Sequence, residues 1–362
     1  MYLKRIIISG FKNISEADIE FSSKLNCITG MNGSGKTNLL DAIYYLSMTK
    51  SYFSNTDIHT IAYDRDICRF SGEYARDDNS FENISISMER EGLKHIKRNS
   101  KSYSRISEHI GLIPIVMVSP YDACLINESS EERRRFINSI LSQLDKEYLR
   151  KVQTYNHHLL QRNRLLKSQD LNEELIDTFS QRMSVNASYI FAKRAEFANL
   201  LMPIADKYYK MLSGGKENIS IVYKSDLQEG RLMELLSSCR SRDIALKYTT
   251  CGVHRDDLQF YMDNYPYRIS GSQGQQKSFL ISLKLAQFEI MRDIYKRAPL
   301  LLLDDVFDKL DMERVEALLN LVSSNFFGQI FITDSNKVRV EAILNKINGS
   351  TSSFEIKNGV VL

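Results

Sequence analysis

One segment near the amino terminus has the residue types and spacing of a phosphate-binding loop. Its eight members fit the pattern G-x-x-x-x-G-K-[ST] and are Gly30, Met31, Asn32, Gly33, Ser34, Gly35, Lys36 and Thr37. Glycines permit the turns that aim successive N–H groups at one anion, and a helix starting there adds its positive end. The lysine can reach the β- and γ-phosphates, and the threonine hydroxyl can ligate Mg²⁺. The alternative is an ordinary glycine turn before a helix, but a chance match is on the order of one in a hundred.

Two adjacent acids far downstream form a candidate magnesium site. They are Asp304 and Asp305, which follow the apolar run 300–303. Such a run is typical of a buried parallel strand, and ligand groups gather at the carboxyl ends of these strands. We predict that Asp304 and Thr37 hold Mg²⁺, which needs few protein ligands, and that Asp305 orients or deprotonates the attacking water. Together with Lys36, these two acids are the predicted catalytic residues; the alternative is an exposed strand end that merely carries acids.

A second glycine turn, residues 271–276, opens a predicted helix that runs to about residue 296. A serine and a glycine at a helix start leave N–H groups that suit an anion. One nucleotide cannot easily use two such helix starts from a single chain in the same way. The turn is therefore predicted to face the γ-phosphate of a nucleotide on a partner molecule, with a simple helix cap as the alternative.

Apolar spacing predicts the elements that must position these residues. The amino-terminal part is expected to be rich in strands, with one helix at 38–48, and the strands are 2–9, 17–21, 25–29, 70–74, 84–88 and 113–118. From about 130 to 211, apolar residues recur every three or four positions, which predicts long amphipathic helices with a turn near 168–172. The last third returns to an α/β pattern, with strands at 300–303 and 330–333, a helix at 311–322 and a hairpin turn at 358–359.

Composition places the chain among globular proteins of about two domains. Its 362 residues are 43% hydrophobic and 26% charged. No stretch approaches the roughly 20 apolar residues of a membrane helix, so no membrane partner is expected. Five cysteines without a CxxC pair argue against a disulfide framework or zinc site and favour a reducing, cytoplasmic location.

Basic residues gather in two places, although the net charge is only +3. Between 92 and 107 there is no acid, and the basic residues are Lys94, Lys97, Arg98, Lys101 and Arg105. A second group comprises Arg133, Arg134, Arg135, Arg150, Lys151, Arg162, Arg164 and Lys167. Clustered basic charge can bind nucleic acid, and solvated surface is the alternative. We predict that DNA contacts the first group, through Lys94, Lys97, Arg98 and Lys101, with the second group left open.

With these motifs in hand, the chain resembles the RecF family of ABC-type ATPases over nearly its full length. The resemblance rests on Phe11-Lys12-Asn13, on the run GMNGSGKTNLLDAIYYL, on GVHRDDLQF followed by SGSQGQQK, and on LLLDDVFDKLD. The segments PYDACLINESSEERRRFIN and LLQRNRLLK are similar to family segments too. The chain departs from the family pattern at Tyr121, Phe53 and Lys309.

The resemblance implies an α/β fold: an ABC-type P-loop ATPase head with a mixed β-sheet and helices (1–119 and 252–362), and an inserted α-helical lobe (120–251). It implies that ATP with Mg²⁺ is held between the phosphate loop of one subunit and the second glycine turn of another. Lys12 and Asn13 would join the first set of contacts, and Ser272, Gly274 and Gln275 would form the second. It also implies an ATP-dependent homodimer on DNA at single-strand/double-strand junctions or gaps, a slow DNA-stimulated ATPase, and cooperation with RecR and RecO in loading recombinase near the nucleoid.

Other functions remain as alternatives. The same scaffold could act as a nucleotide-gated binding module with incidental hydrolysis. A transporter subunit is disfavoured by SQGQQ in place of LSGGQ and by the long interval between Thr37 and Gly271. A kinase loop at His254-Arg255-Asp256 is excluded because Tyr261 stands where that motif needs asparagine.

Overall fold

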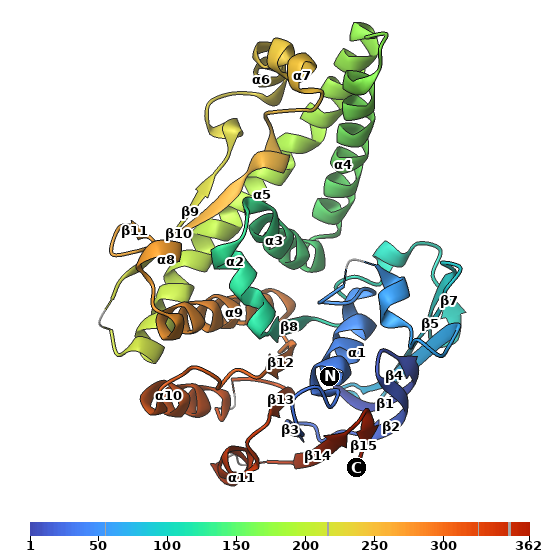
Figure 1. Ribbon diagram of the computed structural model, residues 1–362, viewed down its shortest axis with the longest axis vertical. Helices are drawn as coiled ribbons and strands as arrows, with labels where there is room; N and C mark the ends of the chain where they lie inside the picture. The colour runs from blue at the N-terminus through green and yellow to red at the C-terminus, as the bar shows by residue number, and fades with distance from the viewer. Residues whose placement is uncertain (55, 216, 325, 347–348) are drawn as a thin grey trace. The chain divides into compact units, whose positions relative to one another are not determined.

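The computed structural model describes residues 1–362 except 55, 216, 325 and 347–348 (Figure 1). The chain divides into two compact units. Unit 1 comprises Met1–Asp122, Met211–Gly214 and Gln273–Leu362, and unit 2 comprises Ala123–Lys210 and Gly215–Ser272. The boundary expected at 251/252 is therefore wrong, because residues 252–272 belong to unit 2. The reason is strand pairing: β10 (Asp257–Met262) pairs along its length with β9 (Ile219–Lys224).

A largely parallel sheet in unit 1 gathers the predicted chemistry at one edge. Its strands, in spatial order, are β15 (Val360–Val361), β14 (Thr351–Lys357), β3 (Leu25–Thr29), β13 (Ile330–Asp334), β12 (Leu300–Asp304) and β8 (Ile115–Val118). All pairs from β14 to β8 are parallel. Every residue of β3, β8, β12 and β13 is buried, which explains their continuous apolar sequences. Because the strands are parallel, the residues that follow them meet at one edge.

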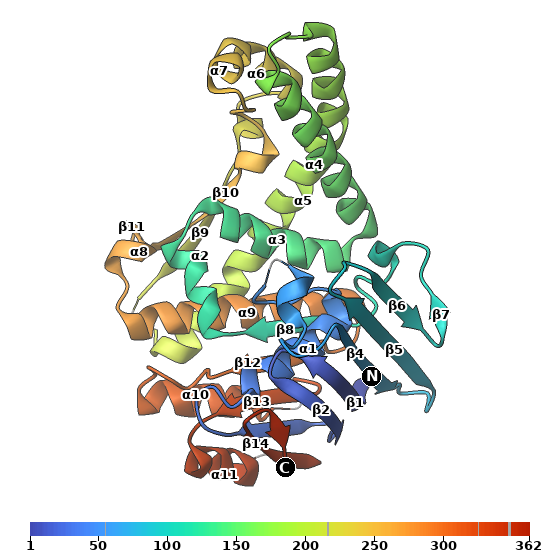
Figure 2. The ribbon, with the colours of Figure 1, turned by 45° about the vertical axis from the view of Figure 1, so that its right-hand side comes forward.

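An antiparallel sheet forms the second layer of unit 1 (Figure 2). Its spatial order is β2 (Ile14–Glu20), β1 (Tyr2–Phe11), β4 (Ile67–Ala75), β5 (Phe81–Glu89), β6 (Lys94–Arg98) and β7 (Lys101–Ser102). The predicted strands at 2–9, 17–21, 70–74 and 84–88 all lie in this sheet. No strand was predicted at β6 or β7, which pair as a hairpin.

Helix α1 (Lys36–Met48) contacts strands of both sheets. Eleven of its 13 residues are buried, as expected for a helix that is covered on all sides. The remaining helices of unit 1 are α9 (Gln273–Tyr295), α10 (Met312–Val322) and α11 (Lys337–Lys346). A single apolar core joins α1 to both sheets, so the start of α1 is held rigidly at the edge where the parallel strands end.

Unit 2 is mainly helical, as expected, but its first long arm is broken. The helices are α2 (Cys124–Asn127), α3 (Ser130–Leu144), α4 (Lys146–Lys167), α5 (Glu173–Ser213, whose last residues lie in unit 1), α6 (Leu232–Ser238), α7 (Arg240–Leu246) and α8 (Tyr267–Ser270). Asp145 separates α3 from α4, because its carboxylate accepts hydrogen bonds from the N–H groups of Glu147 (2.8 Å) and Tyr148 (3.0 Å). The predicted turn at 168–172 is confirmed between α4 and α5, which run side by side in both views (Figures 1 and 2).

Unit 2 also contains a small sheet that the expected helical lobe lacked. Its spatial order is β11 (Tyr265–Pro266), β10 and β9, and both pairs are antiparallel. Across the described part of the chain, none of the helices has the length and apolar character required to span a membrane.

Candidate nucleotide-binding site

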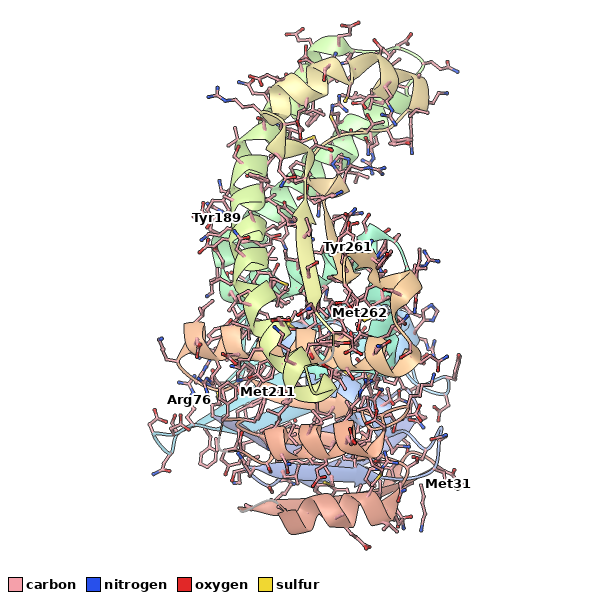
Figure 3. The ribbon with its side chains drawn as sticks, turned by 90° about the vertical axis from the view of Figure 1, so that its left-hand side faces the viewer. Met31, Arg76, Tyr189, Met211, Tyr261 and Met262 are labelled. Atoms are coloured by element: carbon pink, nitrogen blue, oxygen red, sulfur yellow. The ribbon has the colours of Figure 1, made fainter. Side chains whose placement is uncertain are left out.

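The predicted phosphate loop connects β3 to the first turn of α1. Gly30, Gly33 and Gly35 have φ values of 154°, 79° and 118°, which glycine adopts without strain. A side chain at Gly30 would place its Cβ 2.4 Å from the carbonyl oxygen of Ile356 in β14. The loop thus needs glycine at this position for both conformation and space. Met31 lies at the loop tip and is 83% exposed (Figure 3).

Lys36 is buried and its ammonium points back over the loop. Nζ donates hydrogen bonds to the carbonyl oxygens of Gly30 (2.9 Å) and Met31 (3.1 Å). Lys36 is also the first residue of α1, so the cation and the N–H groups of the helix start lie at the same place. This combination suits a polyphosphate, because both contributions favour negative charge at one point.

The turn after β1 contacts the phosphate loop and the first turn of α1 through hydrogen bonds. Asn13 donates from Nδ2 to the carbonyl oxygen of Ser34 (3.3 Å) and accepts from Nδ2 of Asn38 (2.7 Å). Lys12 forms an ion pair with Asp41 of α1, at 2.6 Å. Since Asp41 is fully buried, the ammonium of Lys12 serves at least to neutralise this carboxylate. Both predicted residues therefore support the loop in this structure, and direct contact with a nucleotide stays a prediction.

Thr37 and Asp304 meet although they are distant in the sequence. The hydroxyl Oγ1 of Thr37 is 3.0 Å from each carboxylate oxygen of Asp304. Asp304 also accepts from Oγ1 of Thr333 (2.7 Å) and, more weakly, from Oγ of Ser119 (3.5 Å). These groups come from the ends of three adjacent parallel strands and the start of α1, which is the convergence that a parallel sheet provides.

The two acids at the end of β12 lie in different surroundings. Burial raises the pKa of the Asp304 carboxyl, while hydrogen bonds from Thr333 and Thr37 oppose this effect. Burial also raises the pKa of Asp305, and the nearby ammonium of Lys36 opposes it. A buried carboxylate is stabilised by a cation, so both acids gain from a divalent ion at this edge of the sheet.

A pocket of about 280 Å³ opens beside the loop. It is lined by Asn32, Gly33, Gly35, Lys36, Thr37, Asn38 and Asp305. Within the described residues, no cluster of three or more His, Cys, Asp or Glu could enclose a metal by itself. A carboxylate and a hydroxyl beside a phosphate pocket nevertheless fit Mg²⁺, which keeps several waters and completes its shell with phosphate oxygens.

The second glycine turn contributes no residue to the lining of this pocket. Helix α9 begins at Gln273, three residues earlier than predicted, and includes Gly274 and Gln275 in its first turn. Neither residue lines the pocket. Ser272 is the last residue of unit 2. Contact of this turn with a nucleotide on a partner molecule stays a prediction.

The predicted DNA-contact residues separate into two pairs. Lys94 is mostly buried: Nζ lies 3.0 Å from a carboxylate oxygen of Asp57, and burial lowers the pKa of Lys94. Arg98 forms an ion pair with Glu82, which is buried. Lys97 and Lys101 are exposed. Alternation along β6 turns both Lys94 and Arg98 toward carboxylates of the protein itself, and their contact with DNA stays a prediction.

Lys97 borders a groove on the outer face of the antiparallel sheet, of about 340 Å³. Its other lining residues are both polar and apolar: Ile7, Ser9, Arg69, Phe70, Ser71, Ser85, Ile86, Ser87 and His95. The second basic group is largely engaged elsewhere. Arg133 pairs with Asp257 at 2.7 Å, and Arg135 pairs with two glutamates of its own helix.

Sequence reasoning missed Ser119, Thr333 and Lys277. Ser119 and Thr333 lie at the ends of apolar strands, as Asp304 does, so the same signal could have found them. Lys277 donates from Nζ to the carbonyl oxygen of Asp305 (3.0 Å). Nothing in the local sequence indicates this contact.

Comparisons with known proteins identify the family of the chain. The RecF/RecN/SMC N terminal domain family matches residues 2–355. The DNA replication and repair protein RecF of Bacteroides fragilis (strain YCH46) is 44% identical over 362 residues, which is 100% of this chain and 98% of that protein. The chain belongs to the RecF family. The DNA replication and repair protein RecF of Parabacteroides distasonis is also 44% identical to this chain, over 361 residues that cover 100% of this chain and 99% of that RecF.

Solved structures of RecF have the same fold. The recombination mediator protein RecF, described as RecF-ATP in the RecFOR pathway, has a TM-score of 0.89 at 29% identity and covers 100% of this chain and 97% of its own. The Smc head domain of Pyrococcus furiosus, bound to the C-terminal domain of ScpA, has a TM-score of 0.58 at 15% identity, covering 99% and 95%. The fold is therefore that of RecF and of SMC-type ATPase heads, in agreement with the α/β ATPase head that the resemblance implied.

Proposed function

We propose that this RecF-family chain is an ATPase of DNA replication and repair that binds DNA as an ATP-dependent dimer. The observation that carries the proposal is the hydrogen bonding of Thr37 to Asp304, because Thr37 and Lys36 both line the pocket beside the phosphate loop. The RecF relatives named above are DNA replication and repair proteins, and one solved RecF is described with ATP. The reaction is hydrolysis of the terminal phosphoanhydride bond.

Each residue of the pocket has a defined task in this proposal. The loop N–H groups and Lys36 bind the phosphates, and Thr37 with Asp304 holds Mg²⁺, which neutralises the developing charge when bound. Asp305 lines the pocket and orients or deprotonates the attacking water. Most of the rate enhancement comes from positioning and charge stabilisation, because phosphoryl transfer leaves little covalent work to the protein.

A second copy of the chain completes the site in this proposal. Ser272, Gly274 and Gln275 of one molecule face the γ-phosphate held by the other, so ATP joins the two molecules and hydrolysis releases them. Hydrolysis is slow and stimulated by DNA, since a clamp must persist on its substrate. Gapped or junction DNA is the proposed substrate, and RecR- and RecO-type proteins are the proposed partners, because one solved RecF is described as a mediator in the RecFOR pathway.

Light scattering with and without ATP and Mg²⁺ tests the dimer directly. The wild type is expected to double in mass with ATP, and Lys36→Met is expected to stay monomeric because it lacks the phosphate-binding cation. Lys296→Met is a matched control, since Lys296 is an exposed lysine just after α9. Full ATP-dependent dimerisation of Lys36→Met would contradict the proposal, as would a wild type that stays monomeric.

The DNA surface is proposed to include Lys97 and Lys101, the two exposed members of the predicted set. Replacing both with glutamine should weaken DNA binding and lower the slope of log K against log salt by roughly 0.9 for each phosphate that the protein no longer neutralises. The matched control is Arg164→Gln with Lys167→Gln, which removes the same charge from exposed positions of the second basic group. A lower salt slope only in the control pair would place the DNA contacts on α4 instead.

A further inference from the structure

The backbone of Asp305 adopts a conformation that must be held in place. Its φ is 44°, in the left-handed region that a non-glycine residue enters only at some cost. Two hydrogen bonds fix this residue from opposite sides. The N–H group donates to Oγ1 of Thr333 (3.0 Å), and the carbonyl oxygen accepts from Nζ of Lys277 (3.0 Å).

Lys277 reaches this carbonyl from the first turns of α9. The side chain is partly buried, and it lies near several acids, of which Asp308 and Asp305 interact most strongly with it. Burial lowers the pKa of Lys277, whereas these carboxylates favour its charged form. The ammonium thus bridges α9 and the segment that follows β12.

A second contact ties the same two segments together. A Cβ added to Gly274 would lie 3.0 Å from Nη1 of Arg314 and 3.6 Å from the carbonyl oxygen of Lys309. Gly274 therefore packs closely against the segment after Asp305. The first turn of α9, from Gln273, and the chain from Asp305 to Arg314 consequently pack together within unit 1.

We propose that Lys277 is a positioning residue for Asp305: it holds the strained peptide so that the carboxylate points at the bound nucleotide. The inference rests on the proposed function, because it presumes that Asp305 acts on the attacking water. Lys277 itself touches neither water nor phosphate in this role. Gly274 and Gln275 precede Lys277 in the same helical turns, so binding of a partner's nucleotide to them also steadies Asp305.

The test compares Lys277→Met, Lys277→Arg and the control Lys296→Met with the wild type. Wild-type dimerisation and hydrolysis are measured first, because their absence would reject the proposed function and not this inference. Lys277→Met is expected to bind ATP and dimerise as the wild type does, while single-turnover hydrolysis falls on the order of 100-fold, the cost of a misplaced group. Lys277→Arg keeps a cationic donor and should restore most of the rate. KM should change little in all three variants.

Hydrogen exchange gives a readout that does not depend on activity. With ATP bound, peptides covering 305–311 should exchange faster in Lys277→Met than in the wild type, and at the wild-type rate in Lys296→Met. Hydrolysis by Lys277→Met at about the wild-type rate would overturn the inference. Loss of dimerisation together with hydrolysis in a folded Lys277→Met would also overturn it, because Lys277 would then serve the interface. If Lys277→Met does not fold, Lys277→Arg and Lys277→Gln decide: equal rates would reject a role for the cation.

Discussion

Two glycines of the phosphate loop should respond very differently to the same added methyl group. At Gly30, a Cβ would lie 2.4 Å from the carbonyl oxygen of Ile356 and 2.7 Å from Oγ of Ser34. Ordinary contact begins near 3.4 Å, so relief requires a shift of about 1 Å (3.4 minus 2.4). The Ile356 oxygen belongs to β14, which is paired with β3 and cannot move freely. The loop must therefore yield.

Gly33 is the matched control, since it lies in the same loop with a positive φ of 79° but has no atom within 4 Å of an added Cβ. Because Gly33 lines the pocket, the comparison concerns contacts within the protein: there Gly33→Ala should cost only the left-handed conformation, about 1–2 kcal/mol. Gly30→Ala adds a displacement of about 1 Å, which costs roughly 100-fold where groups must be aligned. We expect Gly30→Ala to weaken ATP binding and hydrolysis together by roughly that factor.

The assay is titration with a fluorescent ATP analogue, followed by single-turnover hydrolysis, on variants whose folding is checked by circular dichroism. Gly33→Ala should stay within about 30-fold of the wild type, which corresponds to about 2 kcal/mol. Equal ATP affinity of Gly30→Ala and Gly33→Ala would refute the reasoning, because it would show that the contact with β14 does not shape the loop.

Three further outcomes follow from the structure. Asp305→Asn should bind ATP and remain dimeric while hydrolysis falls, so rapid single-turnover hydrolysis by this variant would clear Asp305 of its proposed role. Lys284→Met leaves the buried carboxylate of Asp122 without its ion-pair partner at 2.8 Å and should cost about 3–5 kcal/mol in denaturant unfolding; a loss below about 1 kcal/mol would contradict this. Burial lowers the pKa of His254 to about 4, with its ring bonded to Tyr155 (2.9 Å). Because the unfolded chain binds this proton near pH 6.5, His254 should contribute full stability above pH 6.5 and lose it progressively toward pH 4. The free energy of unfolding of His254→Gln should therefore fall less steeply over this range, and a wild-type pH profile in that variant would argue against the assignment.

Part of the site was predictable because its signals are local. The spacing of glycines, Lys36 and Thr37 marks a phosphate loop, since backbone turns and a helix start require those residues in sequence. The apolar run before Asp304 marks a buried parallel strand. The apolar strand before the phosphate loop and the apolar strand before Asp304 were together sufficient to predict that Thr37 and Asp304 lie close to each other.

The division of the chain was harder to predict because strand pairing is not local. The sequence allows residues 257–262 to belong to either unit, and the pairing of β10 with β9 places them in unit 2. The break at Asp145 was equally hidden, because the apolar spacing of α3 continues into α4. There a single capping carboxylate, and not the periodicity, decides where one helix ends and the next begins.

By itself, the sequence determined that the chain has a phosphate loop, a strand-end acid pair and an α/β head with a helical insertion. Only the tertiary structure decided which cations are available and which side chain holds Asp305. The sequence does not distinguish Lys94 from Lys97. In the structure, Lys94 is paired with Asp57, whereas Lys97 is exposed to solvent. The physical reason is that charge pairing and backbone support depend on residues that are distant in the sequence. Lys277 and Asp305, for example, become neighbours only when α9 packs against the parallel sheet, where it contacts β8.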